Sequence, residues 1–248
     1  MLALVLEDLE SSESWLTKLY ELNAVIAATG EPVAGNIFYD HHQEDYAETP
    51  PVAFNRTKRD RFRRACAGCT RMLEVGVNGG HSAYLALTSN PSLEFHGVDI
   101  ADHAYVRPAI EWLEREFPGR VFFYEGDCLK VLPKLARGGL RPDLFHIDGV
   151  KHTYYRDILN SHRMLEGRNA LVIVDDVEMS SVERIWRRCL SDGLIAQAPD
   201  FPSMPESDEH RNAVGILTPI SRWRWALYRS LVSSRWLRSR IRRRLALR

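Results

Sequence analysis

The clearest indication of the fold is the segment Met72-Leu73-Glu74-Val75-Gly76-Val77-Asn78-Gly79-Gly80-His81-Ser82. An apolar run leads into glycines and then into a helical pattern, which predicts a strand, a tight turn and a helix. Glycine lets the backbone bend sharply and lets a ligand approach it closely. In an open α/β sheet such a turn lies at the carboxyl end of the strand, where ligands bind. The stretch therefore predicts an α/β domain with a ligand at this turn.

The spacing of the glycines separates two classes of cofactor. The dinucleotide fingerprint G-x-G-x-x-G, counted from Gly76, would need glycine at Asn78 and His81, and neither position has one. The pattern present is E-x-G-x-x-x-G, which resembles the first motif of class I S-adenosylmethionine (SAM) methyltransferases. In that family the acidic residue and the glycine turn hold the methionine end of SAM. The resemblance assigns to the cofactor here Glu74, Gly76, Gly80 and Ser82.

Strand and helix patterns alternate along the chain after this turn. Strands are expected at 72–75, 92–100, 121–125, 142–149, 170–176, 193–198 and 213–217. Helices between them are expected at 81–88, 103–117, 127–135, 154–165 and 180–191. Five strand-helix units followed by a hairpin predict a doubly wound, Rossmann-like α/β fold. Its sheet is mainly parallel and seven-stranded, with an antiparallel final hairpin.

The two ends of the chain extend this core. A helical pattern over 3–28 predicts one or two added N-terminal helices, which pack on the core or on a second subunit. Gly35–Asn55 is irregular and rich in aromatic and histidine side chains, which suits a lid or substrate loop or else a solvated surface loop. We expect an N-terminal extension at 1–55, a SAM-binding domain at 56–220 and a basic C-terminal helix at 221–248.

The second and third strands both end in acidic residues. Asp99 follows Gly76 by 23 positions, and its carboxylate can accept hydrogen bonds from two ribose hydroxyls. It could instead cap the next helix, but the glycine motif favours the ribose role. Gly126-Asp127 resembles the methyltransferase position that contacts adenine, and Asp127 also suits a helix N-cap. The further residues expected at the cofactor are Asp99, Ile100, Asp127, Cys128 and Asp148.

Three carboxylates are expected to gather where the fourth and fifth strands end. Asp148 ends one strand, and Asp175 and Asp176 end its neighbour, about 4.8 Å away. Unpaired carboxylates this close repel one another and would take up protons. A divalent cation, Mg²⁺ in the first place, would resolve the repulsion, because oxygen-only ligands suit it. The alternative is two helix caps and one solvated acid.

With these residues the resemblance narrows to the metal-dependent O-methyltransferases, both the bacterial antibiotic- and sugar-modifying branch and the catechol-type branch. The motifs that carry it are Ile147-Asp148-Gly149, the following His-Thr-Tyr and the terminal Asp175-Asp176. The resemblance implies that Asp148, Asp175 and Asp176 hold the metal. The metal would bind substrate oxygens and lower the pKa of a hydroxyl. The implied reaction is direct methyl transfer from SAM to a small hydroxylated molecule, such as a sugar or a secondary metabolite.

One position departs from the bacterial pattern. That branch has a base histidine three residues after the first metal aspartate, where this chain has Lys151, and His152 follows one step later. The catechol-type branch has lysine at that spacing. Lys151 needs a lowered pKa to act as a base, whereas histidine as a residue type has an ordinary pKa near neutrality. Because Thr153-Tyr154 continues the bacterial pattern, His152 is slightly preferred.

The charge of the chain is balanced overall but unevenly distributed. Residues 221–248 hold ten arginines and no acidic residue, interleaved with Trp, Leu and Tyr, while all 33 acidic residues come earlier. This composition is typical of an interfacial helix, so the tail could contact an anionic membrane, or it could fold over the acidic body of its own or a neighbouring subunit. Nucleic acid is the less favoured partner, since no RNA- or DNA-binding motif accompanies the arginines.

Several expectations rest on weaker signals. Cys66 and Cys69 form a lone C-x-x-C, which is expected to be a pair of reduced, partly buried thiols rather than a zinc site. The N-terminus lacks the basic region of a signal peptide, so the protein is expected to be cytoplasmic. A homo-oligomer is plausible from the added N-terminal helix. Two other functions stay open: a metal-independent N- or O-methyltransferase, and a non-catalytic SAM-binding or membrane-associated scaffold.

Overall fold

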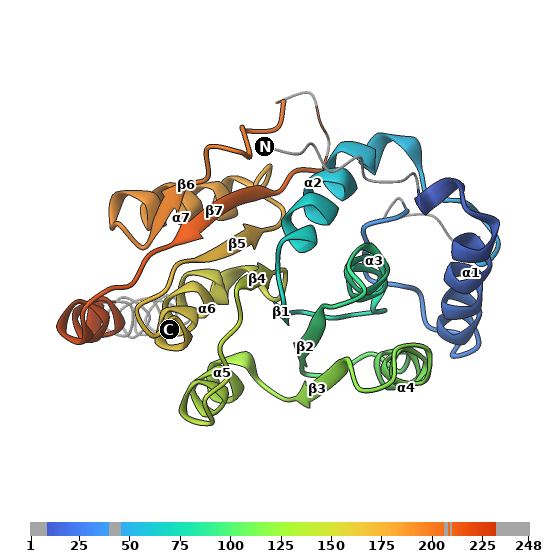
Figure 1. Ribbon diagram of the computed structural model, residues 1–248, viewed down its shortest axis with the longest axis horizontal. Helices are drawn as coiled ribbons and strands as arrows, with labels where there is room; N and C mark the ends of the chain where they lie inside the picture. The colour runs from blue at the N-terminus through green and yellow to red at the C-terminus, as the bar shows by residue number, and fades with distance from the viewer. Residues whose placement is uncertain (1–8, 40–45, 206–207, 209, 232–248) are drawn as a thin grey trace, which may run out of the picture.

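The computed structural model describes residues 9–39, 46–205, 208 and 210–231, and a seven-stranded sheet lies at its centre (Figure 1). The strand order is β3-β2-β1-β4-β5-β7-β6. Neighbours in the first five strands pair in parallel, and β7 is antiparallel to both β5 and β6. The strands are β1 Arg71–Val75, β2 Glu94–Asp99, β3 Val121–Glu125, β4 Leu144–Ile147, β5 Ala170–Val174, β6 Ile195–Gln197 and β7 Ala213–Leu217. The predicted doubly wound sheet with its antiparallel final hairpin is confirmed.

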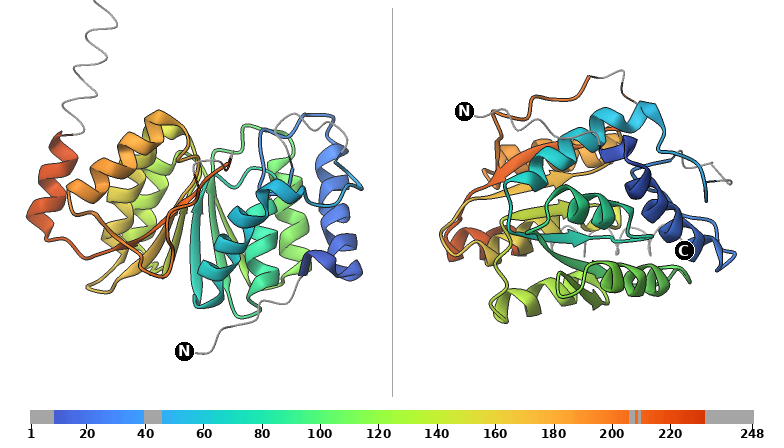
Figure 2. Two further views of the ribbon diagram at one scale, coloured as in Figure 1. Left: turned by 90° about the horizontal axis from the view of Figure 1, so that it is seen from above. Right: turned by 45° about the vertical axis from the view of Figure 1, so that its right-hand side comes forward.

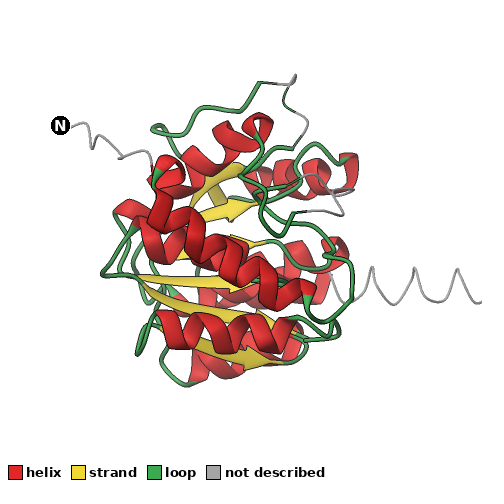
Figure 3. Ribbon diagram, turned by 90° about the vertical axis from the view of Figure 1, so that its right-hand side faces the viewer, coloured by secondary structure: helices red, strands yellow, loops and turns green. Residues whose placement is uncertain are grey.

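Helices cover both faces of the sheet (Figure 2, left; Figure 3). The α-helices are α1 Glu13–Ala27, α2 Arg56–Ala67, α3 His81–Ser89, α4 Val106–Glu116, α5 Cys128–Arg137, α6 Tyr154–Ser161 and α7 Ser180–Ser191. One face carries α2, α3 and α4, with α1 packed outside them against α4, and the other face carries α5, α6 and α7. The change of face falls between β1 and β4, which makes the carboxyl ends of these strands the topological switch point.

The apolar core is divided by the sheet into two clusters. In β1, Met72 faces the cluster beneath α1–α4, whereas Leu73 and Val75 face the cluster beneath α5–α7. The central strands are buried on both faces, which explains the continuous apolar run of β5. Glu74 interrupts this pattern, because it is a fully buried carboxylate in the middle of a central strand.

The predicted helix at 103–117 begins later than expected. The α-helix starts at Val106, because the residues before it are held by the N-terminal segment. The ring of His103 contacts the carboxylate of Glu31, and the Ala104 amide donates to the same carboxylate at 2.6 Å. The predicted helix at 154–165 likewise ends as an α-helix at Ser161 and continues as a 3-10 turn, His162–Met164.

The segment expected as a lid is partly built into the core. Phe38, Tyr39 and Tyr46 are buried, and the Asn23 amide of α1 donates to the Tyr39 hydroxyl at 2.8 Å. The Asn36 carboxamide oxygen accepts from the amides that follow it, which fixes the turn. Residues 40–45, and with them part of the expected lid, lie outside the described residues.

Two further features bear on the sequence predictions. Cys66 and Cys69 are free, buried thiols, as expected. Within the described part of the chain, no helix is long and apolar enough to cross a membrane. Residues 1–8 and 232–248, which include the start of the predicted N-terminal helix and most of the basic tail, are not described.

Candidate functional site

A cavity of about 700 Å³ opens at the carboxyl ends of β1, β2, β4 and β5, the volume range of small-molecule and cofactor sites. Most residues that the sequence assigned to a site line it. They are Gly76, Ser82, Asp99, Ile100, Asp127, Cys128, Asp148, Lys151, His152, Asp175 and Asp176. Glu74 and Gly80 are not among the lining residues.

Gly76 makes the turn at the end of β1 and lets the loops after β1 and β4 approach each other. Its backbone is left-handed, with φ +90°, a conformation that favours glycine. A Cβ atom there would lie 2.5 Å from the backbone oxygen of Asp148 and 2.7 Å from Cα of Gly149. The lack of a side chain at Gly76 therefore lets the loop after β4 close against the loop after β1, and both form the cavity wall.

Gly80 acts behind the cavity rather than in it. It is the N-cap residue of α3 with φ +75°, and a Cβ atom there would lie 2.7 Å from Cδ1 of Leu113 in α4. Glycine at this position therefore lets α3 begin close to α4. Gly80 would therefore affect ligand binding indirectly, by setting the position of α3.

Asp99 holds the glycine turn in place. Its Oδ2 accepts hydrogen bonds from the amides of Val77 at 2.8 Å and Asn78 at 3.0 Å, and its Oδ1 accepts from Ala101 at 2.8 Å. A carboxylate has about four lone-pair sites, so this one still has acceptor capacity on its cavity side. Ile100, beside it, is 54% exposed and presents an apolar surface to the cavity.

Asp127 both caps a helix and lines the cavity. It is the N-cap residue of α5, where its carboxylate accepts from the Leu129 amide at 2.9 Å, and it also lines the cavity. Cys128 follows at the start of the helix. Burial raises the pKa of its thiol to about 12, which keeps the sulfur protonated at neutral pH.

Glu74 is engaged inside the protein. The register of β1 and β4 places it directly opposite His146, and its Oε1 lies 2.5 Å from Nδ1 of that ring. Burial opposes a charge on His146, but the hydrogen bond and charge of Glu74 outweigh it and raise the pKa of the imidazole. The structure thus gives Glu74 a partner inside the protein, while the cofactor contact that the motif suggested stays a prediction.

The three aspartates at the ends of β4 and β5 are paired with two lysines. Asp175 Oδ2 lies 2.7 Å from the ammonium group of Lys58, a buried residue of α2. Lys151 contacts Asp148 Oδ1 at 3.2 Å and also contacts Asp176. The carboxylates therefore have cationic partners within the protein, and one of these, Lys58, reaches the cluster from a helix far away in the sequence.

These contacts set the protonation of the cluster. Burial opposes the positive charges of Lys58 and Lys151, but the neighbouring carboxylates outweigh it and raise the pKa of both ammonium groups. Burial, followed by the charge of Asp175, raises the pKa of Asp148. Asp175 shows the reverse, because burial is outweighed by the charge of Lys58, and its pKa is lowered. The two aspartates therefore differ in their readiness to take up a proton.

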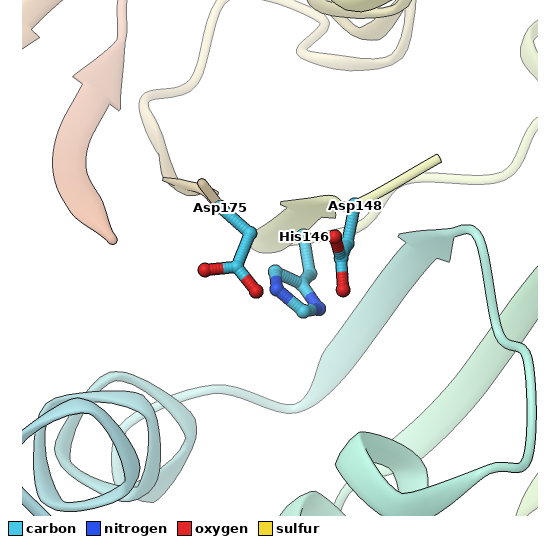
Figure 4. A group of neighbouring side chains, drawn as sticks. All are labelled: His146, Asp148 and Asp175. Atoms are coloured by element: carbon cyan, nitrogen blue, oxygen red, sulfur yellow. The ribbon is translucent and has the colours of Figure 1, made fainter. Parts of the chain in front are cut away.

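The side chains that are grouped suitably for a cation are not the three predicted aspartates. His146, Asp148 and Asp175 each offer one atom, and these atoms lie within 4.8 Å of one another (Figure 4). Asp175 Oδ1 is buried and has no hydrogen-bond partner among the described residues. Asp176 is not in the group. Two carboxylates and an imidazole fit a divalent cation, with a ring nitrogen taking the place predicted for a third carboxylate.

His152 is exposed at the cavity rim in the 3-10 turn Lys151–Thr153, whereas Lys151 contacts Asp148 and Asp176 and donates to the Tyr154 hydroxyl at 2.9 Å. Both residues line the cavity, and which of them is the base stays a prediction. The sequence analysis missed both Lys58 and His146. His146 stood out locally as a titratable side chain in the apolar strand Leu144–Ile147, whereas Lys58 lies in a helix rich in basic residues, where no local pattern marks it.

Residues 73–177 match a family model described as "Methyltransferase domain". The chain contains a methyltransferase domain. This methyltransferase domain runs from β1 to the loop after β5, so it holds the glycine turn, Asp99, Asp127 and all three aspartates of the cluster. The predicted resemblance to the class I methyltransferases and the predicted enzyme class are confirmed.

Solved structures share the fold of this methyltransferase domain and of its flanking elements. An O-methyltransferase from Bacillus cereus in complex with S-adenosylhomocysteine (SAH) has a TM-score of 0.59 at 15% identity, covering 84% of this chain and 91% of its own. The O-methyltransferase TomG from Streptomyces achromogenes, in complex with SAM, has a TM-score of 0.59 at 14% identity, covering 85% and 92%. At these identities the likeness shows the fold alone. A search of curated proteins found no sequence match.

Proposed function

We propose that the protein is a SAM-dependent O-methyltransferase that acts on a hydroxyl group of a small molecule, such as a sugar or a secondary metabolite. The observation that carries this proposal is a cavity, built by a methyltransferase domain, with a ribose-type carboxylate at one end and a lysine–aspartate cluster at the other. The cofactor-bound structural neighbours support SAM as the methyl donor.

The proposed position of SAM follows the cavity wall. Asp99 would accept hydrogen bonds from the ribose hydroxyls, and Ile100 would pack on the adenine ring beside Asp127 and Cys128. The methionine end would lie along the turn at Gly76. Ser82, Gly76 and Asp148 complete the set that contacts the cofactor, while Glu74 and Gly80 shape the turn from behind.

The acceptor hydroxyl would lie at Lys151. Its ammonium group is held by two carboxylates and a tyrosine hydroxyl, so it is oriented before the substrate arrives. It would bind the acceptor oxygen and direct it in line with the sulfonium methyl group. With no cation bound, the hydroxyl proton would pass to Asp148, whose pKa is raised. With a cation bound, the proton would leave to solvent water. The sulfonium is itself the leaving group, so the reaction needs no covalent enzyme intermediate.

A divalent cation is part of the proposal, with a changed ligand set. Asp148, Asp175 and His146 would hold it, and Asp176 would keep Lys151 in position. When bound, the cation would lower the pKa of the acceptor hydroxyl as a Lewis acid. Because a ligating imidazole must be neutral, binding would release the proton that Glu74 stabilises on His146.

A metal-independent methyltransferase is the second candidate function. The observation in its favour is that each of the three aspartates already has an ammonium partner, from Lys58 or Lys151. The two candidates differ in the role of Lys58, which would stand in for the cation in the second one. Activity that persists after exhaustive treatment with EDTA would favour this candidate.

Calorimetric titration with SAH tests the cofactor site. We expect Asp99→Ala to weaken SAH binding by about 100-fold, because the lost carboxylate accepts hydrogen bonds from the ribose and fixes the turn amides. Asp143→Ala is the matched control, since the Asp143 carboxylate also accepts from backbone amides, those of Thr70 and Arg71 at 2.9 Å, but does not line the cavity.

The two variants therefore distinguish a direct role in cofactor binding from a role in stabilising a loop. Asp143→Ala should lower the free energy of unfolding while leaving the affinity for SAH unchanged. If the wild-type protein binds no SAH, the proposed function is wrong. Titration of the same samples with Mn²⁺ should give a separate heat that Asp175→Asn removes. A wild-type protein that binds SAH but gives no such heat supports the metal-independent candidate.

Turnover of Lys151 variants tests the acceptor site. An acceptor is first found by incubating the protein with methyl-labelled SAM and a panel of sugars and phenols. We expect Lys151→Met to lower turnover by about 100-fold with little change in SAH affinity, because the variant keeps the volume of the side chain but loses its charge. His152→Ala, at the exposed rim, should retain most of the activity. The reverse order of effects would restore His152 as the base.

A further inference from the structure

The helix at residues 222–231 is fixed to the body of the protein by one face. Trp225 Nε1 donates to the backbone oxygen of Leu159 at 2.8 Å, and the Tyr228 hydroxyl donates to that of Asp192 at 2.8 Å. The Arg224 guanidinium donates to the same oxygen at 2.9 Å, and Arg163 lies 5.0 Å from the Trp225 ring centroid. These contacts orient the helix about its own axis.

A second side of this helix is an exposed apolar stripe. Trp223 is 69% exposed, Leu227 is 48% exposed and Leu231 is 43% exposed. Positions four residues apart lie on one side of a helix, so the three side chains form one row. They are three of the eight large apolar side chains that are exposed in the described part of the chain, which makes this row the main apolar surface outside the cavity.

The charge around the stripe has a single sign. The helix carries Arg222, Arg224 and Arg229, and the sequence beyond it adds seven arginines, while no acidic residue follows Glu209. The body before residue 221 is acidic, with 33 acidic side chains against 23 basic ones. A cationic helix with Trp and Leu on its outer face is complementary to a surface that is both anionic and apolar.

We propose that residues 222–231 dock the protein on an anionic lipid surface, with Trp223, Leu227 and Leu231 inserted at the headgroup boundary. A lipid surface fits better than a nucleic acid. Phosphates and bases would satisfy the arginines and the tryptophan, but they offer no apolar medium for Leu227 and Leu231, whereas a bilayer offers both. The proposal is independent of the methyl-transfer chemistry.

The docking helix lies away from the cavity. Figure 1 and the left panel of Figure 2 place it at the edge of the molecule, beside the layer of α6 and α7. It contacts Leu159 near the end of α6 and Asp192 just after α7. Each of these helices starts at the carboxyl end of a strand and runs back toward the amino ends, so both contacts lie toward the amino ends of the strands. Because the cavity opens at the carboxyl ends, a protein docked through this helix would keep its cavity clear of the bilayer.

Sedimentation with vesicles tests the proposal on the full chain. We expect binding to vesicles of phosphatidylcholine with phosphatidylglycerol, and at least about tenfold weaker binding to phosphatidylcholine alone. Raising NaCl from about 0.1 M to about 1 M should weaken the binding. The double variant Trp223→Ser/Leu227→Ser should bind anionic vesicles at least about tenfold more weakly than the wild type. Met179→Ser, at a 44% exposed methionine elsewhere, is the matched control and should bind like the wild type.

Tryptophan fluorescence gives a second measurement, which reports the insertion of Trp223 itself. Binding to anionic vesicles should shift the emission to shorter wavelength, and Trp223→Phe should remove most of the shift. Three outcomes would overturn the proposal: no binding to anionic vesicles, equal binding by the double variant, or a dimer of the wild type that the double variant loses. The last would mean that a second copy covers the stripe.

Discussion

Gly76→Ala is expected to weaken cofactor binding more than any other glycine-to-alanine substitution in this chain. The added Cβ would lie 2.5 Å from the backbone oxygen of Asp148, and a backbone atom cannot move aside as a flexible side chain can. The left-handed backbone at φ +90° adds its own strain. Together these costs predict a loss of about 2–5 kcal/mol in the free energy of unfolding.

Binding should suffer with stability, because the strain is relieved by separating the loops after β1 and β4, which are the two walls of the cavity. We expect the affinity for SAH to fall by about 100-fold or more, measured by calorimetry on protein that thermal unfolding shows to be folded. The control is Gly119→Ala, at φ +76° with nothing within 4 Å of the added carbon. It carries the backbone strain without the close contact. Equal effects of the two substitutions on SAH affinity would show that the contact with Asp148 is unimportant.

Lys58→Met is expected to be the most destabilising change of a charged residue at the site. It would leave Asp175 buried without its ammonium partner, which lies 2.7 Å away in the wild type. Removing one partner of a buried ion pair costs about 3–5 kcal/mol, because the remaining charge is not solvated. Urea unfolding near neutral pH would measure the loss.

A double-mutant cycle shows whether the pair itself is responsible. The variant Lys58→Met/Asp175→Asn removes both charges, and we expect it to recover much of the stability lost in Lys58→Met. Lys18→Met is the matched control, because Lys18 forms exposed ion pairs with Glu21 and Glu116. Exposed pairs are screened by water, so its effect should be much smaller. A Lys58→Met variant as stable as Lys18→Met would contradict the pairing.

Lys58→Met also tests whether a cation binds at the cluster. If Mn²⁺ binds at Asp148, Asp175 and His146, adding Mn²⁺ should restore stability to Lys58→Met, because a cation that binds only the folded state stabilises it. A lack of response to Mn²⁺ in both the wild type and Lys58→Met would favour the metal-independent candidate, in which Lys58 replaces the cation.

The order of the elements, and the end of the sheet where the ligand cavity lies, could be predicted from local sequence patterns. Strands, turns and helices follow local patterns, such as the apolar run of β5 and the glycines after β1, so their places could be predicted within a few residues. Parallel strands align their carboxyl ends, so the same patterns brought Asp99, Asp127, Asp148 and Asp175 to one cavity. The differences, such as the late start of α4, arose where a distant residue, Glu31, held the chain.

The pairing of the charges at the site, in contrast, depends on packing between distant parts of the chain. Lys58 reaches Asp175 across more than a hundred residues, and Glu74 meets His146 because β1 and β4 are neighbours in one register. No local pattern encodes these contacts, since they depend on how helices and strands that are distant in sequence pack side by side. The sequence could place the acidic residues, because their positions follow from strand ends. It could not show which cations neutralise them, because that depends on a helix packed over the sheet from elsewhere in the chain.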